Sequence, residues 1–217
     1  MSELQHEKHP FLDFVKKNQK ALTYALSIVV IVIAGYFGYT ELYQNPREAK
    51  AADAMYAAER YFAVDSSNLV LNGDGSSKGV LYLLKQFGGT KAANLAKYYA
   101  GISYYRLNDF NKSIEYLKDF STSSKQVQAI AYGTIGDAYS ELKNNEEAVN
   151  YYKKAGGHFP EDEAISSEYL FRAAALLELN GKAEDAVAIY KDIKSKYPKS
   201  EKGFSVDKYI NRLKIQP

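Results

Sequence analysis

Few residues in this chain combine the types and the spacing that catalysis or metal binding needs. His6 and His9 stand three residues apart, where two imidazoles could share a metal ion, but no third ligand lies near them in the sequence. His158 stands alone just before Pro160, with no histidine partner. The chain contains no cysteine, which excludes disulfides, thiolate metal sites and cysteine nucleophiles. We therefore expect a solvated tail around the first two histidines and a surface position for His158.

Two other stretches have part of the composition of a functional site. Residues 72–76, Asn-Gly-Asp-Gly-Ser, lack the third acidic side chain and the distal glutamate of a calcium loop, so we expect an ordinary turn there. Glu146 and Glu147 fall at the predicted start of a helix, where they complement its dipole. The sequence has no glycine-rich phosphate loop and no nucleophile elbow. It therefore predicts no catalytic residue, no cofactor, no metal site and no small-molecule substrate.

The composition disfavours one further class of partner. The 217 residues carry 28 Lys and Arg against 26 Asp and Glu, a formal net charge of +2, and no basic stretch alternates with aromatic residues. A nucleic-acid partner is therefore not expected. The chain also has 20 tyrosines and no tryptophan. At helical spacing we expect most of these tyrosines to form the core, with a minority left for a binding face.

The clearest pattern is a helix–turn–helix unit of 34 residues at positions 129–162. Small, apolar and aromatic residues recur in it at helical spacing before a closing proline: Tyr132, Ile135, Gly136, Tyr139, Ala148, Tyr152, Ala155 and Pro160. Gly136 and Ala148 have almost no side chain, so two antiparallel helices can approach closely there. Asn144 and Asn145 are good N-cap residues for the second helix, and the pair at 156–157, Gly-Gly, can end it.

Two weaker copies flank this unit. A shift of 35 residues towards the N-terminus aligns Gly101, Tyr104, Ser113, Leu117 and Phe120, and a shift of 38 residues towards the C-terminus aligns Ala174, Leu177, Ala186, Tyr190 and Ile193, with Pro198 closing. One unit cannot bury its own apolar face, so neighbours must stack on it. We therefore expect three units over residues 94–200 that form a short right-handed solenoid.

The series of small and aromatic residues resembles the tetratricopeptide repeat at every signature position. In that family the second, fifth, ninth, twelfth and thirteenth positions of each first helix line a concave groove that binds polypeptides. Carried onto this chain, the resemblance implies a partner-binding groove of Leu95, Tyr98, Ile102, Tyr105 and Arg106 from the first repeat, Asp137, Ser140 and Glu141 from the second, and Phe171, Glu178 and Leu179 from the third. Such a groove would be apolar and aromatic at one end and acidic at the other.

One mode of recognition within that family is not expected here. Members that grip the carboxylate at a chaperone's C-terminus need lysines and asparagines at groove positions. Tyr98 and Ile102 occupy two of those positions in this chain.

An apolar stretch near the N-terminus predicts a membrane anchor. Residues 21–40 contain no charge, and a helix of that length spans about 30 Å, the thickness of a bilayer's hydrocarbon core. Aromatic residues cluster at its far end, as they do at membrane interfaces. A cleaved signal peptide is the alternative, but its apolar region is shorter and a small-residue cleavage site follows it closely. We therefore expect an uncleaved transmembrane helix at 21–43.

The placement of lysines predicts the orientation of this anchor. Lys16, Lys17 and Lys20 precede it, whereas the first basic residue after it is Arg47. The positive-inside rule then makes residues 1–20 a cytoplasmic tail and places the repeats outside the cytoplasm, in the periplasm of a bacterium. Within the anchor, three small residues could share one face and dock another transmembrane helix: Ser27, Ala34 and Gly38.

The remaining segments complete an all-α chain, with an N-terminal transmembrane helix followed by a tetratricopeptide-repeat α-solenoid. Residues 44–93 are expected to form a linker helix and a degenerate first repeat: a break or kink at Asn45 and Pro46, a helix at 47–64, a polar loop at 65–78 and a short helix at 79–87. Residues 201–217 are expected to form a capping helix. In it Phe204, Ile210 and Leu213 would cover the end of the stack, while Glu201, Lys208 and Arg212 face water.

A short cytoplasmic tail, one membrane helix and an extracytoplasmic repeat domain resemble the layout of the YfgM-like ancillary subunits of the bacterial Sec translocon. The run FVKKNQK before the anchor and the repeats at 94–200 carry this resemblance. It implies an inner-membrane protein that sits beside the translocon, associates with a membrane-anchored periplasmic chaperone and helps to hand over secretory proteins. A scaffold subunit of another envelope secretion or outer-membrane assembly complex is the alternative.

Overall fold

The structure, a computed structural model, describes residues 10–215, and within that range it contains helices and no strand. The predicted all-α class is confirmed for this part of the chain, whereas His6 and His9 lie outside it. By its internal contacts the chain divides into two compact units, Met1–Ala49 and Lys50–Pro217.

In the first unit, a short helix α1 (Pro10–Lys17) precedes α2 (Gln19–Tyr39), so the predicted tail includes one helix. A π-helical segment, η1 (Thr40–Gln44), then leads into α3 (Asn45–Ala63). No residue of α2 is buried. Among the residues described, the helical stretch Gln19–Ala63 is the one that is long and apolar enough to cross a membrane, with a mean hydropathy of 2.1 over its 18-residue window.

The break or kink expected at Asn45 and Pro46 is a local change of helical pitch. Proline has no N–H to donate, and its ring clashes with the carbonyl four residues earlier in a regular α-helix. The π-helical segment ends at Gln44, two residues before Pro46, and widens the backbone around the carbonyl with which the proline ring would clash. At its start the hydroxyl of Thr40 donates to the carbonyl oxygens of Tyr36 (2.6 Å) and Phe37 (3.1 Å). The helix therefore passes Pro46 without ending.

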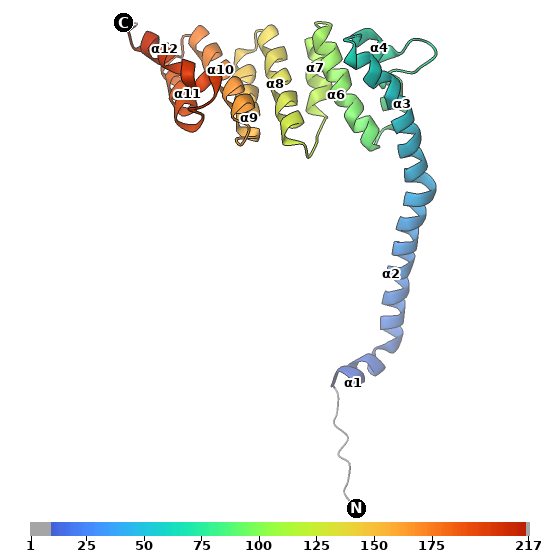
Figure 1. The fold of residues 1–217 in the computed structure, drawn as a ribbon. Helices are drawn as coiled ribbons and strands as arrows, with labels where there is room; N and C mark the ends of the chain where they lie inside the picture. The colour runs from blue at the N-terminus through green and yellow to red at the C-terminus, as the bar shows by residue number, and fades with distance from the viewer. Residues whose placement is uncertain (1–9, 216–217) are drawn as a thin grey trace, which may run out of the picture. The chain divides into compact units, whose positions relative to one another are not determined.

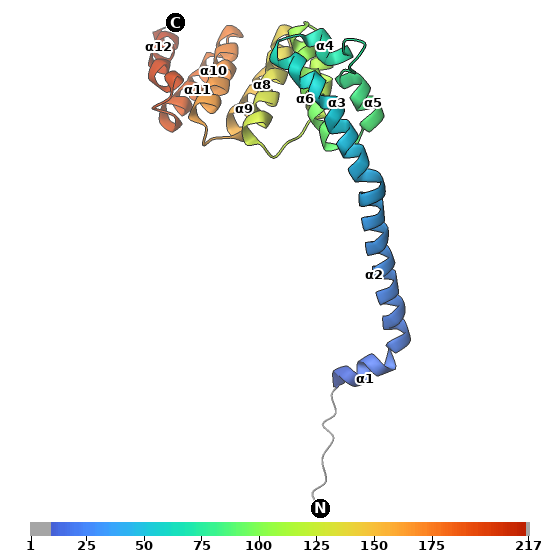
Figure 2. The same ribbon diagram turned by 45° about the vertical axis from the view of Figure 1, so that its right-hand side comes forward.

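The second unit contains three antiparallel helix pairs that stack in succession (Figures 1 and 2). They are α6 (Lys91–Arg106) with α7 (Phe110–Lys118), α8 (Lys125–Glu141) with α9 (Asn145–His158), and α10 (Glu163–Leu179) with α11 (Ala183–Lys196). A last helix, α12 (Glu201–Ile215), packs on α10 and α11. The predicted solenoid of stacked helix pairs is thus present.

The contacts between pairs show which way the row curves. The backbones of successive first helices approach one another, α6 with α8, α8 with α10 and α10 with α12. Over the described residues the second helices stay further apart: the backbones of α7 and α9 are not in contact, and neither are those of α9 and α11. A row with close first helices and splayed second helices curves towards the first. We call the side formed by α6, α8, α10 and α12 the inner face.

Small residues let the helices of each pair approach, as the sequence predicts. A Cβ atom at Gly136 would lie 2.7 Å from the ring of Tyr152, and one at Gly101 would overlap Leu117. Ala148 is fully buried at the matching position of the second helix. Such contacts leave no room for a larger side chain, because protein interiors are close-packed.

The ends of the helices follow local hydrogen bonding, with one correction. Asn144 caps α9 as predicted, since its side-chain oxygen accepts the N–H of Glu147 at 3.4 Å. The predicted end of α9 at residues 156–157 is wrong, because the helix continues to His158. A Cβ atom at Gly156 would lie 2.7 Å from Leu170. Gly156 therefore allows α10 to pack closely against α9, and it does not end the helix.

The polar loop predicted at 65–78 is wrong in its first half, which forms a short helix, α4 (Ser67–Asn72). Val70 and Leu71 are buried there, in a cluster that also includes Met55 of α3 and Leu83 of α5 (Val80–Phe87). The three adjacent apolar residues at 69–71 are too short a signal for helical periodicity, so the pattern did not reveal this element.

The second half of that segment is a turn organised by Asp74. Its carboxylate accepts the N–H of Ser77 at 2.7 Å and of Ser76 at 3.0 Å, and the hydroxyl of Tyr61 at 2.7 Å. The hydrogen bond from Ser77, followed by that from Tyr61, holds the pKa of Asp74 well below its usual range. The carboxylate of Asp74 thus stabilises a turn by accepting its backbone N–H groups, and an ordinary turn is what the sequence predicts here.

Helix α12 covers the last pair with a different set of residues from the one predicted. Ile210 and Leu213 are buried as expected, and Val206 joins them. Phe204 is 75% exposed, so its predicted covering role is wrong. Residues 206, 210 and 213 share one face at helical spacing, whereas a residue two positions before Val206 points to the opposite side.

Candidate interaction surface

The predicted groove residues of the first repeat lie on α6, and three of them take part in packing between repeats. Tyr98, Ile102 and Tyr105 are partly buried against the cluster that joins the first and second pairs. The ring of Tyr98 lies 5.2 Å from that of Phe120, centroid to centroid, and Tyr105 lies 5.7 Å from Phe110. Burial raises the pKa of Tyr98. These side chains offer a partner part of their surface only.

The other two predicted residues of α6 differ in their surroundings. Leu95 is partly buried against the cluster around α4 and α5. Arg106 forms an ion pair with Asp65 at 2.9 Å and stacks over the ring of Phe62 at 4.4 Å. Its guanidinium therefore already has a carboxylate partner at the end of α6.

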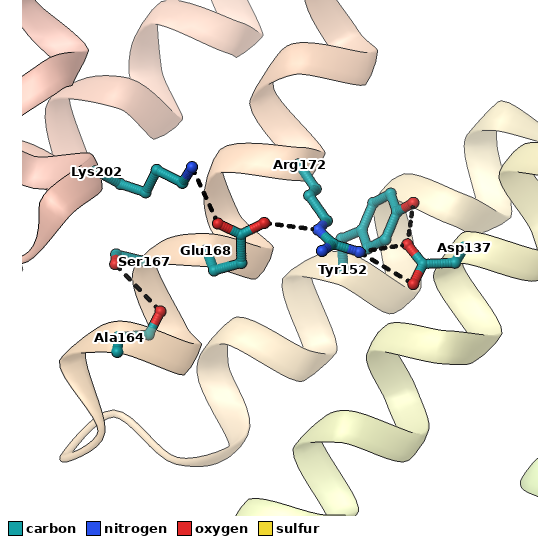
Figure 3. Close-up of polar contacts among 7 residues, drawn as sticks. All are labelled: Asp137, Tyr152, Ala164, Ser167, Glu168, Arg172 and Lys202. Atoms are coloured by element: carbon teal, nitrogen blue, oxygen red, sulfur yellow. Dashed lines mark hydrogen bonds and ion pairs between the residues drawn. The ribbon is translucent and has the colours of Figure 1, made fainter. Parts of the chain in front are cut away.

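A chain of polar contacts crosses the inner face, and Figure 3 shows it. Asp137 of α8 accepts two hydrogen bonds from Nη1 of Arg172 of α10, at 2.8 and 3.0 Å. The Nε of Arg172 donates to Glu168 at 2.8 Å, and Lys202 of α12 lies 3.1 Å from the other oxygen of Glu168. Tyr152 of α9 donates its hydroxyl to Asp137 at 2.8 Å. We call these five residues the polar chain.

The members of the polar chain fix one another's charges. Burial, followed by the charge of Asp137, raises the pKa of Tyr152 well above its usual range. Partial burial of Glu168 favours its protonated form, but hydrogen bonds from Arg172 and Lys202 outweigh burial and lower its pKa. Partial burial acts against the charge of Arg172, yet its hydrogen bond with Glu168 and the charge of Asp137 raise its pKa. Two acids therefore face two bases, and their charges cancel.

The acidic end predicted for the groove is also compensated. Glu178 pairs with Arg212 of α12 and accepts the hydroxyl of Tyr190 at 3.2 Å. Arg212, expected to face water only, thus bridges the last two first helices. Asp137 is paired with Arg172, so two of the three predicted acids, Asp137 and Glu178, have a basic partner one helix further along the inner face. The third, Glu141, is exposed. The charges of Asp137 and Glu178 are therefore compensated within the molecule, which reduces the acidity expected at that end to the charge of Glu141.

Aromatic and aliphatic side chains remain at that end. The ring of Phe171 lies 5.0 Å from Tyr209 and 5.5 Å from Tyr190, with the ammonium of Lys202 4.8 Å above it. Leu179, at the end of α10, is 82% exposed. Ser140 is partly exposed and Glu141 is exposed at the matching end of α8. Glu141 and Leu179 are the predicted groove residues of α8 and α10 that are exposed, so a partner can reach them at these helix ends.

Sequence reasoning missed a contact that shapes the centre of the inner face. The ring of Tyr169 from α10 lies directly on Gly133 of α8, where a Cβ atom would overlap it. Burial raises the pKa of Tyr169 to about 12. A glycine inside a helix is destabilising unless something requires it. Gly133 occupies the fifth position of its repeat, so it was the available signal for this contact.

The residues considered for metal binding or helix docking have simpler surroundings. His158 is partly buried in the last turn of α9, with its ring edge-on to Tyr132 at 5.4 Å. Over residues 10–215 no three His, Cys, Asp or Glu side chains are grouped as a metal site requires. In α2, Ser27 donates its hydroxyl to the carbonyl oxygen of Thr23 at 2.9 Å, and a Cβ atom at Gly38 would meet open space. Ala34 is exposed on the same helix.

Comparisons with known proteins identify the helix pairs. Sequence models described as tetratricopeptide repeat match residues 95–123, 129–155 and 168–200. A TPR repeat-containing protein of Methanocaldococcus jannaschii is 29% identical over 118 residues, which cover 52% of this chain. The aligned part spans about a third, 34%, of that relative's length. The matched segments fall on α6–α7, α8–α9 and α10–α11, and these three helix pairs are therefore tetratricopeptide repeats.

Proposed function

We propose that this protein is a single-pass membrane-anchored interaction module that binds other polypeptides on its inner face. Tetratricopeptide repeats imply a role in protein–protein interaction, and proteins that contain them are typically scaffolds without enzymatic activity. The observation that carries the proposal is the stacking of α6, α8, α10 and α12, which makes one continuous inner face out of four helices.

The exposure of α2 supports the anchor. Its 21 residues would span about 31 Å at the rise of an α-helix, close to the thickness of a bilayer's hydrocarbon core. Apolar side chains such as Ile28, Ile31 and Val32 are each more than half exposed, which is costly in water and favourable in lipid. The lysines before the anchor favour a cytoplasmic N-terminus. In a bacterium this topology places the anchor in the inner membrane and the repeats in the periplasm.

The inner face suits apolar segments of a partner. Two of its acids, Asp137 and Glu178, are paired with arginines of the same molecule, so a strongly charged ligand gains little from them. Tyr98, Tyr105 and Phe171 offer aromatic surface, and Leu179 offers an exposed apolar contact. Aromatic residues are the types that most often dominate protein interfaces. Secretory proteins that emerge unfolded expose apolar segments of this kind.

The resemblance of the layout to YfgM-like proteins supports a more specific role. In that role the anchor sits beside the Sec translocon, and the repeats contact a membrane-anchored periplasmic chaperone or secretory clients. A scaffold subunit of another envelope secretion or outer-membrane assembly complex is the second candidate. Its repeats would use the same surface, so the identity of the bound partner separates the two roles.

Site-specific photo-crosslinking in intact cells tests these proposals. A photoreactive residue is placed at Leu179 or Glu141 on the inner helices, and at the exposed Lys153 of α9 as the matched control. We expect crosslinks to translocon subunits, the chaperone or secretory chains from the first two positions only. Crosslinks to a different envelope complex would support the second candidate. No crosslink to any protein from the inner positions would contradict the interaction module itself.

A further inference from the structure

Helix α1 exposes two large aromatic side chains. Phe11 is 74% exposed and Phe14 is 58% exposed. Together with Val15 they recur at i, i+3 and i+4, which puts all three on one face, whereas Lys16 and Lys17 fall outside it. A helix of 8 residues is marginal in water by itself. An apolar environment against this face would stabilise it.

A hydrogen-bonded bend separates α1 from α2. The N–H and the side-chain amide of Asn18 both donate to the carbonyl oxygen of Phe14, at 3.0 and 2.9 Å, and close the end of α1. The carbonyl oxygen of Asn18 accepts the N–H of Leu22 at 2.9 Å in the first turn of α2. In both ribbon views α1 turns away from the axis of α2 (Figures 1 and 2). If α2 crosses a bilayer, such a bend directs α1 along the bilayer surface.

Positive charge gathers at this bend. Lys16, Lys17 and Lys20 are exposed and line one shallow cleft of about 390 Å³. Between residues 10 and 20 the sequence has a single acid, Asp13. Lysines beside an apolar helical face are the pattern of helices that bind anionic membrane surfaces. An anionic phospholipid leaflet offers both complements at once, phosphates for the lysines and acyl chains for the phenylalanines.

We propose that α1 is an interfacial helix that lies on an anionic phospholipid leaflet, with Phe11 and Phe14 at the acyl boundary and the lysines at the headgroups. The inference rests on the proposed role of α2 as a membrane span and adds a lipid-binding element to it. In this arrangement α1 fixes the depth and rotation of the anchor where it enters the membrane.

Fluorescence of single-tryptophan variants tests the proposal, since the chain has no tryptophan. Full-length Phe14→Trp is reconstituted in phosphatidylcholine vesicles with and without about 30% phosphatidylglycerol, using lipids brominated near the headgroup or near the bilayer centre. We expect blue-shifted emission that shallow bromine quenches in the anionic vesicles. Substitution of Lys16, Lys17 and Lys20 by Gln should reverse this, since each lysine changes partitioning about five-fold. The same change at Lys153, Lys191 and Lys199 is the matched control.

A second variant, Leu26→Trp in α2, separates this inference from the anchor itself. We expect deep bromine to quench it in both types of vesicle. If Leu26→Trp is quenched while Phe14→Trp stays solvent-exposed in anionic vesicles, the inference is overturned and the anchor stands. Equal quenching of Phe14→Trp in both lipids, insensitive to the lysine variant, also overturns the anionic specificity. An unquenched Leu26→Trp removes the anchor and the inference together. The vesicles are symmetric, so the direction of insertion does not affect these outcomes.

Discussion

The ring of Tyr169 from α10 lies directly on the backbone of α8 at Gly133, where α8 has no side chain. The next turn of the same two helices carries the ion pair of Arg172 with Asp137. An apolar contact and a charged contact thus hold neighbouring first helices in register. Both lie on the inner face, which links the stability of the stack to the surface proposed for binding.

Replacement of Gly133 by Ala should destabilise the protein. The added Cβ overlaps the ring of Tyr169, and overpacking of this kind costs about 1–3 kcal/mol. The free energy of unfolding in denaturant, followed by helical circular dichroism, measures the change. Gly157→Ala is the matched control, because Gly157 is also helical but a Cβ atom there meets open space. That control should stabilise the protein by about 0.5–1 kcal/mol. Equal effects at both glycines would contradict the close contact.

The ion pair between Asp137 and Arg172 should show measurable coupling in a double-mutant cycle of Asp137→Asn and Arg172→Met. The side chains are 21% and 41% exposed, so solvent screens the pair in part, and we expect about 0.5–1 kcal/mol from the free energies of unfolding. The pair of Lys194 with Asp207 is the control, since its side chains are 54% and 56% exposed. Its coupling should be close to zero. A coupling at Asp137–Arg172 no larger than the control would argue against a structural role for the polar chain.

Buried tyrosines should make the protein lose stability in alkaline solution. Burial raises the pKa of Tyr169 to about 12 from an ordinary value of 10.0. A group whose pKa is raised on folding contributes stability that is complete below its unfolded value and is lost as the pH rises through its folded value. The loss should therefore begin near pH 10 and extend towards pH 12. Tyr152 and Tyr190 are shifted in the same direction.

Unfolding at a series of pH values, with tyrosinate absorbance recorded in parallel, checks this prediction. Tyr169→Phe should weaken the dependence of stability on pH between about 10 and 12, because it removes one of the shifted groups. Tyr56→Phe is the control, since Tyr56 is 66% exposed. A pH dependence that is identical in the wild type and in Tyr169→Phe would contradict the assignment.

Much of the repeat fold can be predicted from the sequence because the close approach of paired helices requires small residues at fixed positions. Gly136 and Gly101 each allow one close approach that a larger side chain would prevent, so their spacing predicts the helix pairs. The N-cap role of Asn144 could be predicted for a similar reason, since it depends on a hydrogen bond within the four consecutive residues 144–147. N-caps and tight helix–helix contacts can therefore be predicted from sequence, because each requires a particular residue type at a particular position.

The pairing of charges on the inner face could not be predicted in the same way. Asp137 and Glu178 were identified as groove residues, but their partners Arg172 and Arg212 stand 35 and 34 residues further on, close to one repeat length. A charged residue on a helix surface fits many partners, and only the stacking of the next repeat selects one. Alignment of the copies in search of opposite charges one repeat apart would have indicated both pairs.

The exposed end of α10 provides a direct test of the proposed binding surface. Leu179 is 82% exposed, so Leu179→Asp should leave the free energy of unfolding within about 0.5 kcal/mol of the wild type. If partners bind the inner face through apolar segments, a buried aspartate would weaken that contact by about 1–3 kcal/mol, because its charge loses water without gaining a partner. Recovery of crosslinked or co-purified partner from membranes measures the effect. Phe204→Asp is the matched control, as Phe204 is 75% exposed on α12 and was not among the predicted groove residues. Loss of partner with Phe204→Asp and not with Leu179→Asp would move the binding surface from the end of α10 to the start of α12.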